Sequence, residues 1–138
     1  MAGRADQRAR SVSERTRYRH RQLADSVRKI IEQRFTEPLT VTAIAAELGV
    51  SPCFLCRVFR HETGATIHGT LTSQRLTRAY ELLSGRQGEN LAMLGLDLGF
   101  ASHGHFTQAF CRRFGRPPSV VRAQLLTHAH KSIFEQDS

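Results

Sequence analysis

Two stretches of the chain decide its fold: LTVTAIAAELGVSPCFLCRVFRHETG (residues 39–64) and LGLDLGFASHGHFTQAFCRRFGRPPSVVR (residues 94–122). Each predicts a short helix, a turn that contains glycine, and a second short helix. In the first stretch, Thr40 is the expected N-cap of one helix and Gly49 its left-handed C-terminal residue. Ser51 caps the next helix at once, ahead of a proline at the first helical position. Such a pair of helices is a helix-turn-helix motif.

The second stretch repeats the first about fifty residues later. Gly99 follows Gly49 by fifty positions, whereas Phe110 follows Phe59 by fifty-one, so the second turn is one residue longer. Phenylalanines spaced four apart line one side of the second motif's last helix, and this spacing places them in the core: Phe106, Phe110 and Phe114. The motif is therefore duplicated within one chain.

Apolar periodicity predicts further helices before, between and after the two motifs. Residues 23–35 give a first amphipathic helix. A longer pattern covers residues 67–84, roughly 25 Å at 1.5 Å per residue, and Asn90 is the expected cap of the helix after it. A final helix opens at the proline pair of residues 117–118 and runs to about Leu126. The expected fold is all-α, with about seven helices in two helix-turn-helix subdomains joined by one long linker helix, a homeodomain-like duplication.

These elements divide the chain into five expected segments. The segments are a basic flexible arm (1–21), a first helix-turn-helix subdomain (22–66), the linker helix (67–84), a second helix-turn-helix subdomain (85–127) and a flexible tail (128–138). The arm is assigned as flexible because it shows no apolar periodicity.

Most of the positive charge lies in the arm. The chain has a formal net charge of +8, and basic chains tend to bind nucleic acid or anionic membrane. Residues 1–22 hold seven arginines against Asp6 and Glu14, a net of +5, which leaves +3 for the other 116 residues. Charge therefore supports DNA binding by the folded part only weakly. The arm itself either contacts DNA phosphates or a minor groove, or is simply solvated.

The second helix of each motif is the expected DNA-reading element, because that helix enters the major groove. The outward residues of the first motif are Cys53, Phe54, Cys56, Arg57 and Arg60. Arg57 is the expected base reader, since arginine can bridge guanine O6 and N7. Cys53 and Cys56 share its face, and Arg60, one turn further on, suits a phosphate.

The outward residues of the second motif are His103, Gly104, His105, Thr107, Gln108, Arg112 and Arg113. Gln108 can bridge adenine, and the two histidines and Gly104 share the base-reading positions with it. Thr107, Arg112 and Arg113 are assigned to phosphates.

The chain from Leu23 to Gln124, about three quarters of its length, resembles the DNA-binding domain of AraC/XylS-type bacterial transcription regulators. The two stretches quoted above carry the resemblance, together with QRLTRAYELL (residues 74–83). The second stretch is the most specific part, because it holds the family's Gly-Phe turn, spaced phenylalanines, Phe-Gly pair, proline pair and closing arginine in order. The sequence departs from the family at Gly95, where alanine is usual and where glycine should weaken the helix by up to about 1 kcal/mol.

The resemblance implies a regulator that docks two recognition helices in successive major grooves of double-stranded DNA and presents a surface to RNA polymerase as an activator. It implies base contacts at Cys53, Cys56 and Arg57, and at Gly104, His105 and Gln108. Family members generally carry a separate sensing or dimerisation domain. The chain is therefore expected to be either a free-standing member or a C-terminal domain whose N-terminal partner domain is missing here.

A second interpretation comes from the cysteine pair. Cys53 and Cys56 form a C-x-x-C at a helix start, a placement typical of reactive thiols. No βαβ pattern accompanies the pair, which argues against a thiol oxidoreductase, and a zinc site would need further ligands. The alternative is a helix-turn-helix-derived interaction module, or a thiol or metal sensor, with weak DNA reading.

Other chemistry finds little support in the sequence. The cysteines number three and no secretory signal is visible, so we expect a cytoplasmic protein with reduced thiols. Histidines at 103 and 105, and at 128 and 130, supply too few ligands for a metal. No catalytic triad, phosphate-binding glycine loop or carboxylate pair stands out, so no enzyme activity, cofactor or metal is expected.

Overall fold

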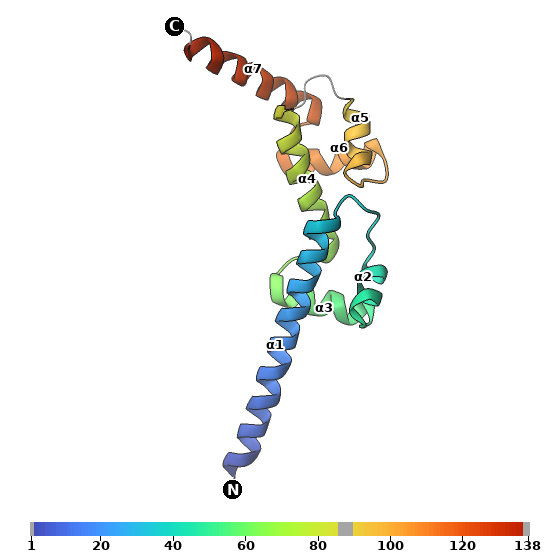
Figure 1. Ribbon diagram of the computed structural model, residues 1–138, viewed down its shortest axis with the longest axis vertical. Coiled ribbons are helices and arrows are strands. Elements are labelled where there is room, and N and C mark those ends of the chain that lie inside the picture. The colour runs from blue at the N-terminus through green and yellow to red at the C-terminus, as the bar shows by residue number, and fades with distance from the viewer. Residues whose placement is uncertain (1, 86–89, 137–138) are drawn as a thin grey trace. The chain divides into compact units, whose positions relative to one another are not determined.

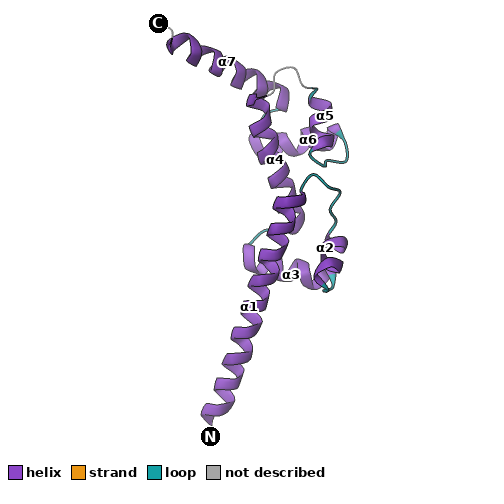
Figure 2. Ribbon diagram, viewed as in Figure 1, coloured by secondary structure: helices purple, strands orange, loops and turns teal. Residues whose placement is uncertain are grey.

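The computed structural model describes residues 2–85 and 90–136, with side chains described for residues 13–84 and 90–127 (Figure 1). Within these residues the chain forms seven helices and no strand (Figure 2), which confirms the expected all-α class. The helices are α1 (Ala2–Arg34), α2 (Val41–Leu48), α3 (Pro52–Thr63), α4 (Ile67–Gly85), α5 (Leu91–Asp97), α6 (His103–Phe114) and α7 (Pro118–Gln136).

The chain forms two compact units, each with one helix-turn-helix. Unit 1 takes residues 1–34 and 39–71, and unit 2 takes residues 35–38 and 72–138. The division therefore falls within α4, and the first four residues after α1, residues 35–38, belong to the second unit.

Unit 1 is built by packing α1 across α2 and α3. Its buried apolar side chains are Ala24, Val27, Ile31, Ile44, Ala45, Leu55, Val58, Phe59, Ile67 and Leu71. At the end of α1, Arg34 Nη1 lies 2.8 Å from both carboxylate oxygens of Glu47 on α2. This contact adds a polar tie to the apolar contact between the two helices.

Unit 2 packs α4, α5, α6 and the start of α7 around the phenylalanines of α6. Its buried residues are Leu76, Ala79, Leu83, Leu94, Leu98, Phe100, Phe106, Phe110 and Val121. Successive rings along α6 touch, with centroids 5.8 Å apart for Phe106 and Phe110 and 4.6 Å apart for Phe110 and Phe114. The phenylalanine spacing is thus a core feature, as expected. Phe35 also packs on this cluster, although it follows α1 directly in the chain.

The caps expected from the sequence are present in both units. The backbone N–H of Ala43 donates to the Thr40 hydroxyl oxygen over 3.1 Å, and equivalent bonds reach Ser51 and Ser102. Gly49 and Gly99 both have positive φ, 71° and 101°, where other residues are strained. The backbone N–H of each glycine donates a hydrogen bond to the carbonyl three residues earlier. The duplication therefore extends to the hydrogen bonds of the turn.

Gly95 is explained by close packing between α5 and α6. A Cβ added at Gly95 would lie 2.6 Å from Phe106 Cβ and 2.7 Å from Phe106 Cγ. The corresponding positions in unit 1 hold Ala45 and Leu55, both fully buried. A smaller residue on α5 thus accompanies a larger one on α6, which keeps the packed volume similar.

Arg75 on α4 is a buried charged side chain, 7% exposed. Its Nε donates to the Phe35 carbonyl over 2.6 Å and its Nη2 to the Glu37 carbonyl over 2.8 Å. The guanidinium also lies 5.8 Å from the centre of the Phe100 ring. Burial lowers the pKa of Arg75 from its usual value. These bonds explain why residues 35–38 belong to unit 2.

Both terminal helices are longer than apolar periodicity predicts. Residues 2–21, the predicted arm, continue α1 without a break. Helix α7 runs through most of the predicted tail, to Gln136. Arginine, alanine, glutamate and glutamine have high helix propensity, and an anchored helix can extend without an apolar face of its own. Residues 1, 137 and 138 lie outside the described part of the chain.

No single helix among the described residues is long and apolar enough to cross a membrane. Helices α2 and α3 reach the length and hydropathy of a membrane span only when they are taken together. The chain bends by 94° between them.

Candidate nucleic-acid interface

The outer side of α3 exposes the residues expected to read DNA in the first motif. Leu55, Val58 and Phe59 face the core of unit 1 and fix how the helix is rotated. The opposite side is exposed to solvent and carries Cys53, Cys56, Arg57 and Arg60. The four side chains therefore share one accessible surface at the start and middle of α3.

Phe54 corrects one part of the sequence interpretation, because it is half-buried and not an outward residue. Its ring meets His20 of α1 edge-on, with ring centroids 5.7 Å apart. The guanidinium of Arg57 lies 5.6 Å from the centre of the same ring. Such a contact restricts the conformations of a long arginine side chain. The contact with His20 could not be read from the sequence, since His20 and Phe54 are 34 residues apart.

The outer side of α6 plays the same part in unit 2. Phe106 and Phe110 are fully buried. The exposed residues are His103, Gly104, His105, Gln108, Arg112 and Arg113. Thr107 is half-buried, and its hydroxyl oxygen lies 3.5 Å from His103 Nε2. Thr107 is therefore less accessible to a phosphate than its neighbours.

Helices α3 and α6 have matching charge distributions. Neither has an acidic residue in its first turn, so the positive end of each helix dipole is not neutralised there. Basic side chains stand in the last turns, at Arg60 and His61 in α3 and at Arg112 and Arg113 in α6. Both helices therefore suit an anionic partner along their exposed sides.

The thiols are all free, with Cys53 and Cys56 exposed and Cys111 half-buried. Among the residues that the structure describes, no three His, Cys, Asp or Glu side chains gather closely enough to hold a metal ion.

The profile of a helix-turn-helix domain family matches residues 44–124, well over half of the chain. The chain belongs to the AraC/XylS family of DNA-binding transcription regulators. It is 29% identical to the regulatory protein SoxS of Salmonella typhimurium over 106 residues, which cover 77% of this chain and 98% of SoxS. It is 30% identical to the Msm operon regulatory protein of Streptococcus mutans over 101 residues, which cover 73% of this chain but 36% of that relative. This AraC/XylS chain thus spans about a third of the Msm operon regulatory protein and nearly all of SoxS.

A solved structure supports the assignment of the fold. The DNA-binding domain of AdpA, a global transcriptional factor, was determined in complex with a target DNA. It superimposes with a TM-score of 0.69 at 27% identity, covering 77% of this chain and 94% of that domain. The two helix-turn-helix fold of this AraC/XylS chain is therefore one that also occurs bound to DNA.

Proposed function

We propose that this chain activates transcription by reading two adjacent major-groove segments of double-stranded DNA, one with α3 and one with α6. The observation that carries the proposal is the duplicated, capped helix whose apolar side is locked in a core while its polar side stays exposed. A helix held in this way can enter a major groove without moving its core. The similarity to AdpA, which was solved on its target DNA, supports the same use.

In this proposal the exposed residues divide into base readers and phosphate contacts. The base readers are Cys53, Cys56, Arg57, His103, Gly104, His105 and Gln108, and the phosphate contacts are Arg60, Thr107, Arg112 and Arg113. Arg57 makes the most discriminating contact, because its fork matches guanine O6 and N7. Cysteine and glycine contribute little hydrogen bonding, so base discrimination rests on the arginine, glutamine and histidine side chains of this set.

Selection of bound sequences from a random DNA pool tests the proposal and identifies the target. Against the selected duplex, Arg57→Ala should lose about 1–3 kcal/mol of binding free energy and relax the preference at one base pair. Arg78→Ala is the matched control, since Arg78 is exposed on α4 and pairs there with Glu81. Unchanged affinity and selectivity in Arg57→Ala would remove this residue as a reader.

The phosphate contacts have a different signature. Arg112→Ala should weaken binding to every sequence alike and lower the slope of log K against log salt by about one. A loss confined to one sequence would place Arg112 among the base readers instead.

Activation implies that the bound protein presents a surface to RNA polymerase, and we include that partner in the proposal. We likewise propose a cytoplasmic, nucleoid-associated protein, and a sensing or dimerisation domain that accompanies this chain, as the greater length of the Msm relative suggests. A promoter carrying the selected site upstream of a reporter gene tests the sign of regulation. Increased transcription is expected, and decreased transcription would make the protein a repressor.

A second candidate function rests on the two exposed thiols at the start of α3. A thiol or metal sensor that has lost DNA reading would keep the fold and bind DNA only through charge. It would then yield no consensus in the selection, and its binding would be sequence-blind and steeply salt-dependent. A defined consensus excludes this function.

A further inference from the structure

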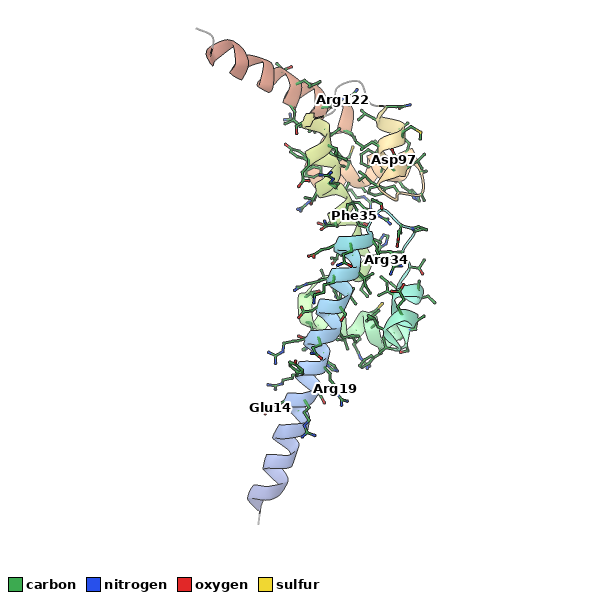
Figure 3. The ribbon with its side chains drawn as sticks, viewed as in Figure 1. Glu14, Arg19, Arg34, Phe35, Asp97 and Arg122 are labelled. Atoms are coloured by element: carbon green, nitrogen blue, oxygen red, sulfur yellow. The ribbon has the colours of Figure 1, made fainter. Side chains whose placement is uncertain are left out.

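The N-terminal part of α1 carries a group of exposed arginines that neither recognition helix uses. Arg15, Arg17, Arg19 and Arg21 are all exposed and lie outside residues 44–124, where the family profile matches (Figure 3 labels Arg19). None of the four forms an ion pair with a carboxylate among the described side chains. Among the side chains that the structure describes, residues 13–34 of α1 include an ion pair between Arg28 and Asp25 over 3.9 Å, further along the helix. We name these four residues the α1 arginine group.

The C-terminal end of the α1 arginine group lies where α1 meets the start of α3. His20, which lies within the group, contacts the Phe54 ring at a centroid distance of 5.7 Å. Phe54 is the third residue of α3, and its N–H donates to the capping Ser51. Its ring also lies 5.6 Å from the guanidinium of Arg57, the expected base reader. Both helices belong to unit 1, and α1 runs on past α3 (Figure 1). The arginines therefore lie along α1 close to the point where it meets the start of α3.

The spacing of the group gives the helix two basic sides. At 3.6 residues per turn, Arg15 and Arg19 share one side of α1, and Arg17 and Arg21 share a nearly opposite one. Like charges four residues apart repel each other and weaken a free helix. A phosphate placed between them removes that repulsion. Whichever side turns toward a polyanion, two arginines face it.

We propose that residues 13–22 of α1 form a third DNA contact, on the sugar-phosphate backbone beside the major groove that α3 enters. This contact rests on the proposed function, since it requires α3 to bind DNA. Arginine contacts to phosphate carry no sequence information. The α1 arginine group thus raises affinity and lengthens the protected site without changing the base preference.

The test replaces all four arginines by glutamine, R15Q/R17Q/R19Q/R21Q, with the lysine variant R15K/R17K/R19K/R21K as the matched control. Glutamine and lysine have helix propensities close to that of arginine, so helix content by circular dichroism should be unchanged. Each lost phosphate contact lowers the salt slope by about 0.9, which corresponds to about eightfold in affinity at 0.1 M salt. For two contacts we expect a slope lower by about 2 and an affinity about 60-fold weaker. The lysine variant should keep most of the wild-type salt slope and most of the wild-type affinity.

Trimming the selected duplex locates the contact. Base pairs are removed from one end at a time, outside the selected consensus. The wild-type protein should lose affinity when one of the two ends is shortened, whereas the glutamine variant should bind the full and the shortened duplex equally. If the wild-type protein and the glutamine variant bind the shortened duplex with equal affinity, the affinity that the arginines add depends on the removed base pairs. The contact then lies on that flank of the site.

The outcomes separate this inference from the proposed function. A glutamine variant with the wild-type affinity and salt slope overturns the α1 contact and leaves sequence-specific binding intact. A glutamine variant that binds DNA normally but activates a reporter poorly also overturns it, and assigns the arginines to a protein partner. Failure of the wild-type protein to select any consensus overturns the proposed function, and the α1 contact falls with it.

Discussion

Replacing Gly95 by alanine tests the close packing of α5 on α6, because helix propensity and tertiary packing predict opposite results. Propensity alone predicts a gain of up to about 1 kcal/mol, since glycine is the poorer helix former. In the structure the new Cβ would lie 2.6 Å from Phe106 Cβ, far inside an ordinary carbon contact. Phe106 Cβ is fixed to its backbone, so the helices must separate to make room.

Overpacking of this kind costs about 1–3 kcal/mol, and the rigid partner atom points to the upper part of that range. After subtracting the gain in propensity, we expect a net loss of about 1–2 kcal/mol in the free energy of unfolding. For a unit of this size the loss corresponds to a melting temperature lower by about 4–16 °C. Urea unfolding followed by circular dichroism measures the change directly.

Gly104→Ala is the matched control. Gly104 is also helical, but a Cβ there would meet nothing nearer than the Ser102 hydroxyl oxygen at 3.8 Å. The same substitution should therefore stabilise the protein by up to about 1 kcal/mol. If Gly95→Ala stabilised the protein as much as Gly104→Ala, the packing argument would be wrong.

Three further predictions concern the core, the caps and the reading surface. Arg75→Ala should lower the free energy of unfolding by about 3–6 kcal/mol, because two hydrogen bonds from a buried charged donor are lost. An unchanged urea midpoint would contradict this prediction. The stability of Arg75→Lys should lie between those of the wild-type protein and Arg75→Ala. Ser102→Ala should cost about 1 kcal/mol in the same assay through loss of the α6 cap, and an effect near zero would mean that water replaces the hydroxyl. Alkylation by N-ethylmaleimide should weaken binding to the selected duplex, because the Cys53 and Cys56 thiols are exposed on the side of α3 that we propose reads bases. The Cys53→Ser/Cys56→Ser variant should resist the reagent, and equal inhibition of both proteins would assign the effect to Cys111.

The local elements of the fold could be predicted because their signals are local. A serine or threonine at an N-cap, a glycine with positive φ and phenylalanines four apart each act within a few residues. These signals recur at an offset of about fifty, which revealed the duplication. The exposure of Arg57 and Gln108 followed from the same periodicity, since fixing the buried side of a helix also fixes its outer side.

The ends of the chain were harder to predict. Apolar periodicity detects helices that pack on a core, and residues 2–21 have none, although their composition favours a helix that is already anchored. Absence of periodicity was therefore interpreted as flexibility at both ends.

Contacts between residues distant in sequence were decided by the tertiary structure alone. The Arg75 guanidinium binds carbonyls about 40 residues earlier in the chain, and nothing in the local sequence distinguishes it from a solvated arginine. Gly95 looks like a weakness in a helix until Phe106 is found against it, and Phe54 looks like an outward residue until His20 is found beside it. Sequence by itself determined the duplicated helix-turn-helix and the sides of its helices, because these depend on hydrogen bonds and periodicity within one element. Tertiary structure decided which side chains close the two cores, because that depends on what the folded chain brings together.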